Sequence, residues 1–331
     1  MRLLCASLFA ASAAFAAVSP EEITPTKKAP FTQPAEADRA ELHAAIKTFM
    51  AKEPGTFEAH AAARDFPGIV EGKERVARTV AYDSNLVHRW DTTNGGAPNL
   101  YTSPDVWQET GLYAAPGEVV IVKVASLPEH RTVKVIVGCH RDSLLKLPKW
   151  NRFPVIARTF ELKVGENKIA NAFGGQLFIQ SSHKDWRKPM KSSPSTPLQF
   201  SNAVAMPTYV LGKDTPESWA KAKQLPAPWV TLSGKQVILH VQASAVKELT
   251  DPKALLEWWD KSMALEDDLI ALRRLAPERV VPDRQISAGF MHSGYPFMCW
   301  IDPSQKDSVD LPKLMKEGNW GFFHELGHNH Q

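Results

Sequence analysis

The stretch GNWGFFHELGHNHQ, residues 318–331, contains His324, Glu325 and His328 in the pattern His-Glu-x-x-His. On a helix, residues four apart project from the same face, so the two imidazoles can point at one metal ion. Glu325 follows His324 directly and reaches the same site as a general base. The stretch therefore predicts a helix that carries two metal ligands, His324 and His328, and one catalytic carboxylate, Glu325.

Zinc is the metal that this pattern predicts, because imidazole nitrogens suit it and it lowers the pKa of water from about 15.7 to about 7. A catalytic zinc site takes three protein ligands, and the chain ends shortly after His328. Upstream residues could complete the site, although their spacing does not single one out. These residues are His292, Asp302, Asp307, Asp310 and Glu317.

Three further segments precede the metal motif in a recognisable order. They are TGLYAAPGEVVIVKV (residues 110–124), NAFGGQLFIQS (residues 171–181) and ISAGFMHSGYPFMCW (residues 286–300). Together with NWGFFHELGHNHQ, they resemble the M60 peptidases, which are enhancin-like or mucin-degrading zinc metallopeptidases of the gluzincin type. The resemblance runs from about residue 106 to the end of the chain.

The resemblance implies zinc ligands at His324 and His328, a catalytic Glu325, and mucin-type O-glycosylated proteins as substrates. The third ligand of the family is a glutamate on a helix beyond the motif, and this sequence has no residue there. We therefore expect a chain that ends before its third ligand. We expect it to bind Zn²⁺ weakly and to hydrolyse glycoproteins poorly or not at all.

The segment HSGYPF before the metal motif is a candidate for substrate binding, through Gly294, Tyr295 and Pro296. In zinc peptidases of this class, a strand beside the metal helix pairs with extended substrate, and Gly and Pro suit such an edge strand. A core strand with a turn fits the same periodicity.

The fold class expected is α+β, with an antiparallel β-sandwich-like domain followed by the start of a helical zincin-type metallopeptidase domain. Punctuation by Pro, Gly and Asn divides the chain. The divisions are a signal peptide (1–16), a linker (17–38), an N-terminal helical region (39–99), a β-rich domain (100–249) and an incomplete metallopeptidase helical region (250–331).

Short β-branched and aromatic runs fill residues 100–249, separated by Gly, Pro and Asp clusters. No helical pattern stands between them, so they predict an antiparallel sheet rather than parallel strands joined by helices. The runs are EVVIVKVA, TVKVIVGCH, ARTFELKV, GQLFIQS, AVAMPTYVL and KQVILHVQ. A capped amphipathic helix begins next, with Asp251 as its cap and Pro252 at its first position.

The first residues predict export. Residues 1–16 contain one arginine, an apolar run and the small-residue cleavage site Ala14-Phe15-Ala16, which is typical of a secretory signal peptide. No second apolar run is long enough to span a bilayer, so we expect no integral membrane segment. A net charge of +3 without a basic run gives no reason to expect a nucleic-acid partner. We expect a secreted, periplasmic or cell-surface protein.

Export would leave two cysteines, Cys139 and Cys299. An oxidising compartment permits a disulfide between them. Both lie in apolar segments, VKVIVGCH and YPFMCWI, where buried free thiols are equally natural. We expect the free thiols over the bridge.

Two functions from different classes fit these observations. The first is a secreted zinc metallopeptidase that cleaves mucin-like O-glycosylated proteins, impaired in this chain by the missing third ligand. The second is a non-catalytic remnant of such a peptidase that binds glycans or glycoproteins. An open reading frame that encodes a glutamate soon after Gln331 would favour the enzyme.

Overall fold

The structure is a computed structural model, and it describes residues 18–86, 106–183, 194–271, 274 and 276–329. The predicted signal peptide, residues 1–16, lies outside the described residues, as do residues 87–99 of the predicted helical region. Within the described ranges, no helix is both long and apolar enough to cross a membrane.

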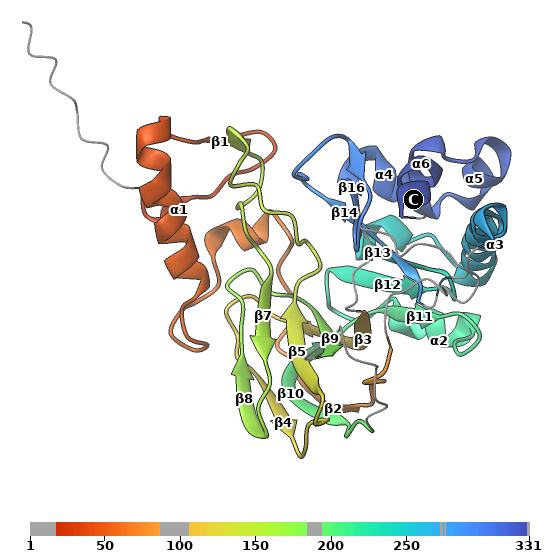
Figure 1. Cartoon of the computed structure of the whole chain (residues 1–331), viewed down its shortest axis with the longest axis horizontal. Coiled ribbons are helices and arrows are strands. Elements are labelled where there is room, and N and C mark those ends of the chain that lie inside the picture. The colour runs from red at the N-terminus through yellow and green to blue at the C-terminus, as the bar shows by residue number, and fades with distance from the viewer. Residues whose placement is uncertain (1–17, 87–105, 184–193, 272–273, 275, 330–331) are drawn as a thin grey trace, which may run out of the picture.

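The N-terminal segment contains a helix, α1, which lies at the left of Figure 1. Three apolar residues at helical spacing, Leu42, Ile46 and Phe49, are all buried. The ring of Phe49 lies 5.9 Å from the ring of Phe153. The elements here are η1 (Pro20–Glu22), β1 (Phe31–Thr32), α1 (Glu36–Met50), η2 (Ala61–Arg64) and β6 (Lys149–Trp150), which pairs with β1.

The first sheet runs in the order β7-β5-β9-β3-β10-β4-β8, with β2 beside β10, and its pairs are antiparallel. Valines on alternate positions of β4 and β5 share one buried cluster, so the two halves of the sheet face each other like a sandwich. The strands are β2 (Val76–Val80), β3 (Trp107–Ala114), β4 (Val120–Val124), β5 (Arg131–Val137), β7 (Arg158–Glu161), β8 (Gly165–Ile169), β9 (Gly175–His183) and β10 (Leu198–Ala205). The predicted antiparallel sandwich-like architecture is confirmed.

A second sheet runs in the order β11-β12-β13-β14-β16-β15 and is mixed. Three of its pairs, β11–β12, β13–β14 and β14–β16, are parallel. The strands are β11 (Thr208–Val210), β12 (Trp229–Ser233), β13 (Val237–Gln242), β14 (Glu278–Asp283), β15 (Met291–His292) and β16 (Phe297–Trp300). The domain boundaries predicted at residues 38, 99 and 249 stay predictions.

The parallel pair β11–β12 departs from the expectation that no helix interrupts the strands. The crossover between them holds helix α2 (Pro216–Ala222), and parallel neighbours need such a crossover. The sequence does carry the signal, because Thr215 and Ser218 form a capping box and Pro216 stands at the first helical turn. The helix is short, and the strand-like segments on either side made its pattern difficult to recognise in the sequence.

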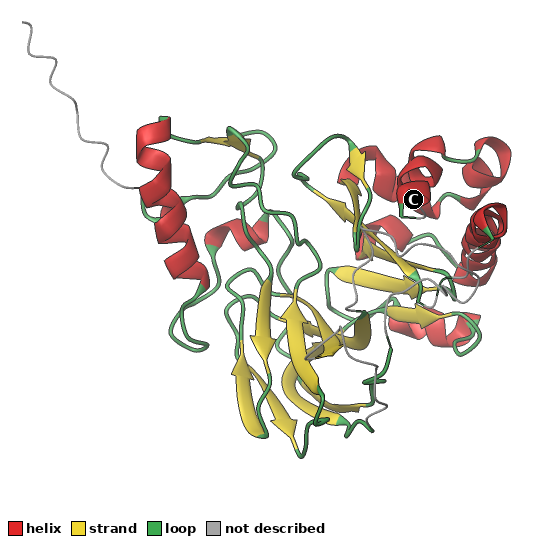
Figure 2. Cartoon of the chain, viewed as in Figure 1, coloured by secondary structure: helices red, strands yellow, loops and turns green. Residues whose placement is uncertain are grey.

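Helices gather on the second sheet, as the red ribbons at the right of Figure 2 show. They are α3 (Pro252–Ile270), α4 (Ile301–Val309), α5 (Leu311–Glu317) and α6 (Trp320–His328). The predicted cap of α3 is confirmed, because the Asp251 side chain accepts a hydrogen bond of 2.8 Å from Lys253 N. The rings of Trp259 in α3 and Phe322 in α6 lie 5.4 Å apart over the sheet, so α6 is fixed by the core of the second sheet.

The two sheets meet around a buried arginine. Arg279 on β14 has no exposed surface and donates hydrogen bonds to Trp107 O and to the Glu109 carboxylate of β3. The contacts of Arg279 fix β14 and β16, and so β15 at the sheet edge, relative to the first sheet.

The thiols of Cys139 and Cys299 are buried and free, as their apolar surroundings favoured.

Candidate active site

Helix α6, which carries the His-Glu-x-x-His motif, begins at Trp320. Its N-cap is Asn319, whose side chain accepts a hydrogen bond from Phe322 N. Phe322 and Leu326 are buried against the second sheet. The helical period therefore turns His324 and His328 away from the core.

The two predicted metal ligands converge. His324 is exposed and His328 is partly exposed, and their Nε2 atoms lie 3.1 Å apart. Two nitrogens that each lie about 2.0–2.1 Å from one tetrahedral ion are about 3.3 Å apart, so the pair fits zinc. No group of three or more His, Cys, Asp or Glu side chains that could hold a metal occurs in the described part of the chain.

Glu325, the predicted base, is held by the edge of the second sheet. Its Oε2 atom accepts a hydrogen bond of 3.0 Å from Ser293 N, in the segment that follows β15. This contact fixes the orientation of the Glu325 carboxylate relative to the segment after β15. The predicted roles of His324, Glu325 and His328 stay predictions about chemistry, on an arrangement that suits them.

Asn329, directly after the motif, anchors the end of α6, and sequence reasoning missed it. Its buried side chain accepts a hydrogen bond of 2.8 Å from Gly294 N and donates to Gly294 O at 3.2 Å. It also donates to Glu278 Oε2 at 2.9 Å. Gly294 has φ of +117°, which favours glycine there. No feature of the sequence marks Asn329.

The structure places the other predicted substrate-binding residues toward the interior. The Tyr295 hydroxyl lies 3.2 Å from Arg279 Nε and 3.3 Å from Trp107 N, and Pro296 is buried. Burial raises the pKa of the Tyr295 phenol. Tyr295 therefore anchors its segment to the junction between the sheets. A role for Gly294, Tyr295 and Pro296 in substrate binding stays a prediction.

The upstream candidates for a third ligand have other partners. His292 bonds through Nε2 to Asp142 Oδ2 at 2.9 Å and through Nδ1 to Ser293 O at 2.9 Å. The four carboxylates contact lysines or cap a helix. They are Asp302 (with Lys27), Asp307 (with Lys313), Asp310 (the cap of α5) and Glu317 (with Lys316).

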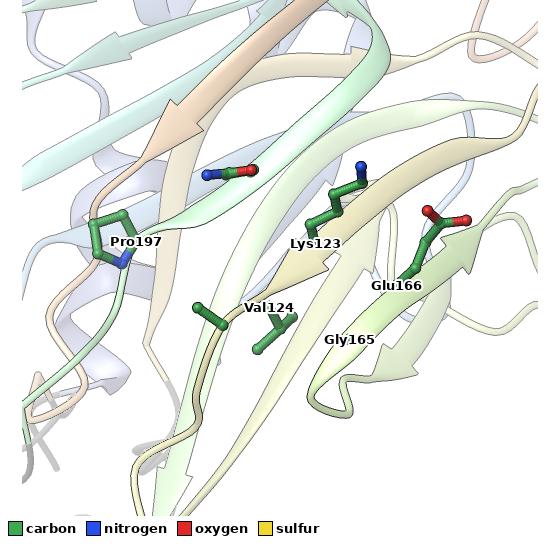
Figure 3. Close-up of a pocket in the computed structure, with 7 residues that line it drawn as sticks. Lys123, Val124, Gly165, Glu166 and Pro197 are labelled. Carbon is green, nitrogen blue, oxygen red and sulfur yellow. The ribbon is translucent and has the colours of Figure 1, made fainter.

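A pocket of about 320 Å³ lies on the first sheet. Figure 3 shows Lys123 of β4 and Glu166 of β8 at its wall, on adjacent strands where the two residues are register partners. Its lining residues come from neither α6 nor β15. The pocket is therefore separate from the histidine pair.

Two family models match consecutive parts of the chain. The model described as N-terminal domain of M60-like peptidases matches residues 76–191. The model described as Peptidase M60, enhancin and enhancin-like, matches residues 202–331. The first match covers strands of the first sheet, and the second includes the second sheet and helix α6.

Curated relatives are similar over most of the chain. The TRPM8 channel-associated factor homolog of Xenopus laevis is 36% identical over 230 residues, which cover 69% of this chain and 25% of that protein. TRPM8 channel-associated factor 2 of Homo sapiens is 36% identical over 232 residues, covering 69% and 24%. The chain spans about a quarter of the length of these relatives.

Solved structures share the fold. The ZmpB metallopeptidase from Clostridium perfringens has a TM-score of 0.51 at 20% identity, covering 77% of this chain and 53% of that one. The M60 catalytic domain of Clostridium perfringens ZmpC, solved with the sialyl T antigen, has a TM-score of 0.52 at 19% identity and the same coverage. With both domain models matched in order and the fold of M60 catalytic domains, this chain belongs to the M60 peptidase family, enhancin and enhancin-like.

Proposed function

We propose that this chain carries the zinc-binding helix of an exported M60 metallopeptidase that hydrolyses peptide bonds in mucin-like O-glycosylated proteins. One observation supports this most directly. The Nε2 atoms of His324 and His328 lie 3.1 Å apart, with Glu325 beside them on the same helix. Two converging imidazoles next to a carboxylate are what metal-assisted hydrolysis requires.

The residues of the site divide the chemistry between them. His324 and His328 would hold zinc through their Nε2 atoms. When bound, zinc would supply a Lewis acid that makes water acidic enough to ionise near neutral pH. Glu325 takes the proton from the attacking water and gives it to the leaving amine. Ser293 N holds the carboxylate in place for both transfers.

The third ligand in this proposal comes from outside the described residues. Within them, no further His, Cys, Asp or Glu joins the histidine pair. A catalytic zinc site takes three protein ligands, so the histidine pair leaves one ligand position for that residue.

The substrate in this proposal lies along β15 as an extended strand. β15 is the edge of the second sheet and lies beside α6, so an extended peptide added there would pass the histidine pair. Glycosylated proteins are the proposed substrates because an M60 relative was solved with a glycan, the sialyl T antigen.

The test uses the protein encoded by the complete gene and its Glu325→Gln variant. We expect the wild type to cleave O-glycosylated mucin and to lose activity on the enzymatically deglycosylated form. Glu325→Gln should keep zinc and lose hydrolysis, because only the base is removed. Hydrolysis by Glu325→Gln at the wild-type rate would refute the assigned base.

Export is proposed from the sequence pattern of residues 1–16. The test is N-terminal sequencing of the protein recovered outside the cytoplasm. We expect a new N-terminus after Ala16, whereas a protein that keeps Met1 would contradict cleavage.

A second candidate is a non-catalytic protein that binds other proteins. It is favoured by the relatives named as TRPM8 channel-associated factors, with 33–37% identity. The two candidates differ in one measurement. A complete protein that neither binds zinc nor cleaves mucin, but retains its fold by circular dichroism, supports the binding role.

A further inference from the structure

The side chain of Asp142 connects the first sheet to the segment that leads into β15. It lies in the loop after β5, and its side chain is 12% exposed. Its Oδ2 atom accepts hydrogen bonds from Ser287 N at 2.6 Å and from His292 Nε2 at 2.9 Å. One carboxylate oxygen thus holds two points of the segment beside the metal helix.

His292 faces an acceptor with each of its ring nitrogens. Nε2 meets the Asp142 carboxylate, and Nδ1 meets the Ser293 carbonyl oxygen at 2.9 Å. A neutral imidazole has only one N–H, so both contacts are hydrogen bonds only when the ring is protonated on both nitrogens. The hydrogen bond that His292 donates to the Asp142 carboxylate raises the pKa of His292, in agreement with this geometry.

Ser293 links Asp142 and His292 to helix α6. Its carbonyl oxygen is held by His292 Nδ1, and its amide donates to Glu325 Oε2 at 3.0 Å. The contacts therefore run without a gap from Asp142 through His292 and Ser293 to Glu325. The carboxylates of Asp142 and Glu325 both act to raise the pKa of His292.

We propose that Asp142 and His292 are positioning residues for Glu325. Asp142, in the loop after β5 of the first sheet, would thus determine where the base lies. This inference rests on the proposed function, which assigns Glu325 as the base. Partners that orient the residues of a metal site typically contribute about 10 to 100-fold in affinity or activity.

A purely structural role for Asp142 makes a different prediction, and the chain offers a matched control. Arg284, directly after β14, also forms an ion pair with a distant part of the chain, through Asp65 of the N-terminal segment at 2.7 Å. Within the described hydrogen bonds, neither residue contacts residues 292–294. Asp65→Asn removes a comparable charge pair and should leave the segment beside Glu325 unchanged.

The experiment measures residue-resolved hydrogen exchange and the ¹⁵N signals of histidine on the zinc-free chain, for wild type, Asp142→Asn and Asp65→Asn. We expect His292 to be an imidazolium at pH 7 in the wild type and in Asp65→Asn, and neutral in Asp142→Asn. A neutral ring keeps Nε2–H and releases the Ser293 carbonyl. Exchange of the Ser293 amide should then rise by about tenfold or more in Asp142→Asn only.

His292→Gln serves as a second variant if Asp142→Asn does not fold. Glu325→Ala should also release the Ser293 amide, and adding Asp142→Asn to it should cause no further increase. In the complete protein, we expect Asp142→Asn to lower kcat by about 10 to 100-fold with KM nearly unchanged.

Equal His292 charge and equal Ser293 exchange in Asp142→Asn and Asp65→Asn would overturn the positioning role. These two readouts need neither zinc nor substrate. A wild-type protein that fails to hydrolyse mucin would contradict the proposed function alone. The contacts from Asp142 to Glu325 would still be tested by the charge of His292 and the exchange of the Ser293 amide.

Discussion

Arg152 and Asp283 form a bidentate ion pair with neither side chain exposed, although 131 positions separate them in the chain. Arg152 Nε and Nη2 lie 2.6 Å and 2.7 Å from the two carboxylate oxygens. Arg152 also donates to the carbonyl oxygens of Phe153 and Asp142. The pair fixes the end of β14, from which the chain continues toward β15 and the metal helix.

Asp283→Asn should destabilise the fold strongly. The change leaves the Arg152 guanidinium buried beside a neutral amide, and breaking one side of a buried pair costs about 3–5 kcal/mol. Urea denaturation measures the loss. Replacing both residues together, as Arg152→Met with Asp283→Leu, should recover part of it.

Glu257→Gln is the control for this prediction, because Glu257 pairs with Lys253 on the exposed face of α3. We expect its effect to stay within about 0.5 kcal/mol. Asp283→Asn would contradict the expectation if its effect were no larger than that of Glu257→Gln.

Asn319→Ala should weaken the metal helix. The Asn319 side chain caps the backbone N–H of Phe322, and losing such a cap costs about 1 kcal/mol. Thermal unfolding followed by circular dichroism measures the change. Asn319→Ser keeps a capping oxygen and should remain close to wild type, whereas equal losses in both variants would show that the cap is not the cause.

His324→Ala and His328→Ala should each lower zinc affinity by more than about tenfold, because each removes one of two converging nitrogens. A competition titration with a chromophoric chelator measures this on the chain. His130→Ala is the control, since His130 lies beside Glu129 on the surface. Zinc affinity that is unchanged in both motif variants would place the metal elsewhere.

The stability difference between wild type and Asp142→Asn should depend on pH. Asp142 raises the pKa of His292, so this contribution is full below about pH 6.5 and is lost as pH rises through the folded value. Burial opposes ionisation of Asp142, but hydrogen bonds from His292 and Ser287 outweigh it and lower its pKa. That contribution is full above about pH 3.9 and is lost as pH falls through the folded value.

We therefore expect the difference in unfolding free energy to be largest between about pH 4 and 6.5. Urea denaturation of both proteins at about pH 5 and 9 measures it. Asp65→Asn, measured in parallel, separates this effect from general changes in charge. A difference that grows from pH 5 to pH 9 would contradict the assigned ion pair.

The sequence determined the local features of this protein. Asn319 and Asp251 cap α6 and α3 because a cap needs only a side chain and the next turn of backbone. His324 and His328 share a face because the helical period places residues four apart side by side. The strands could also be predicted from the sequence, because apolar residues alternate with polar ones along a strand that buries one face.

Only the tertiary structure decided which distant residues meet. Asp142 and His292 are 150 positions apart, and no spacing rule links them, because their contact depends on how the first sheet docks on the second. The same holds for Arg152 with Asp283, and for the parallel pairs of the second sheet. Hydrogen bonds and ion pairs of this kind form where two packed faces bring complementary groups together, and that placement is a property of the folded chain.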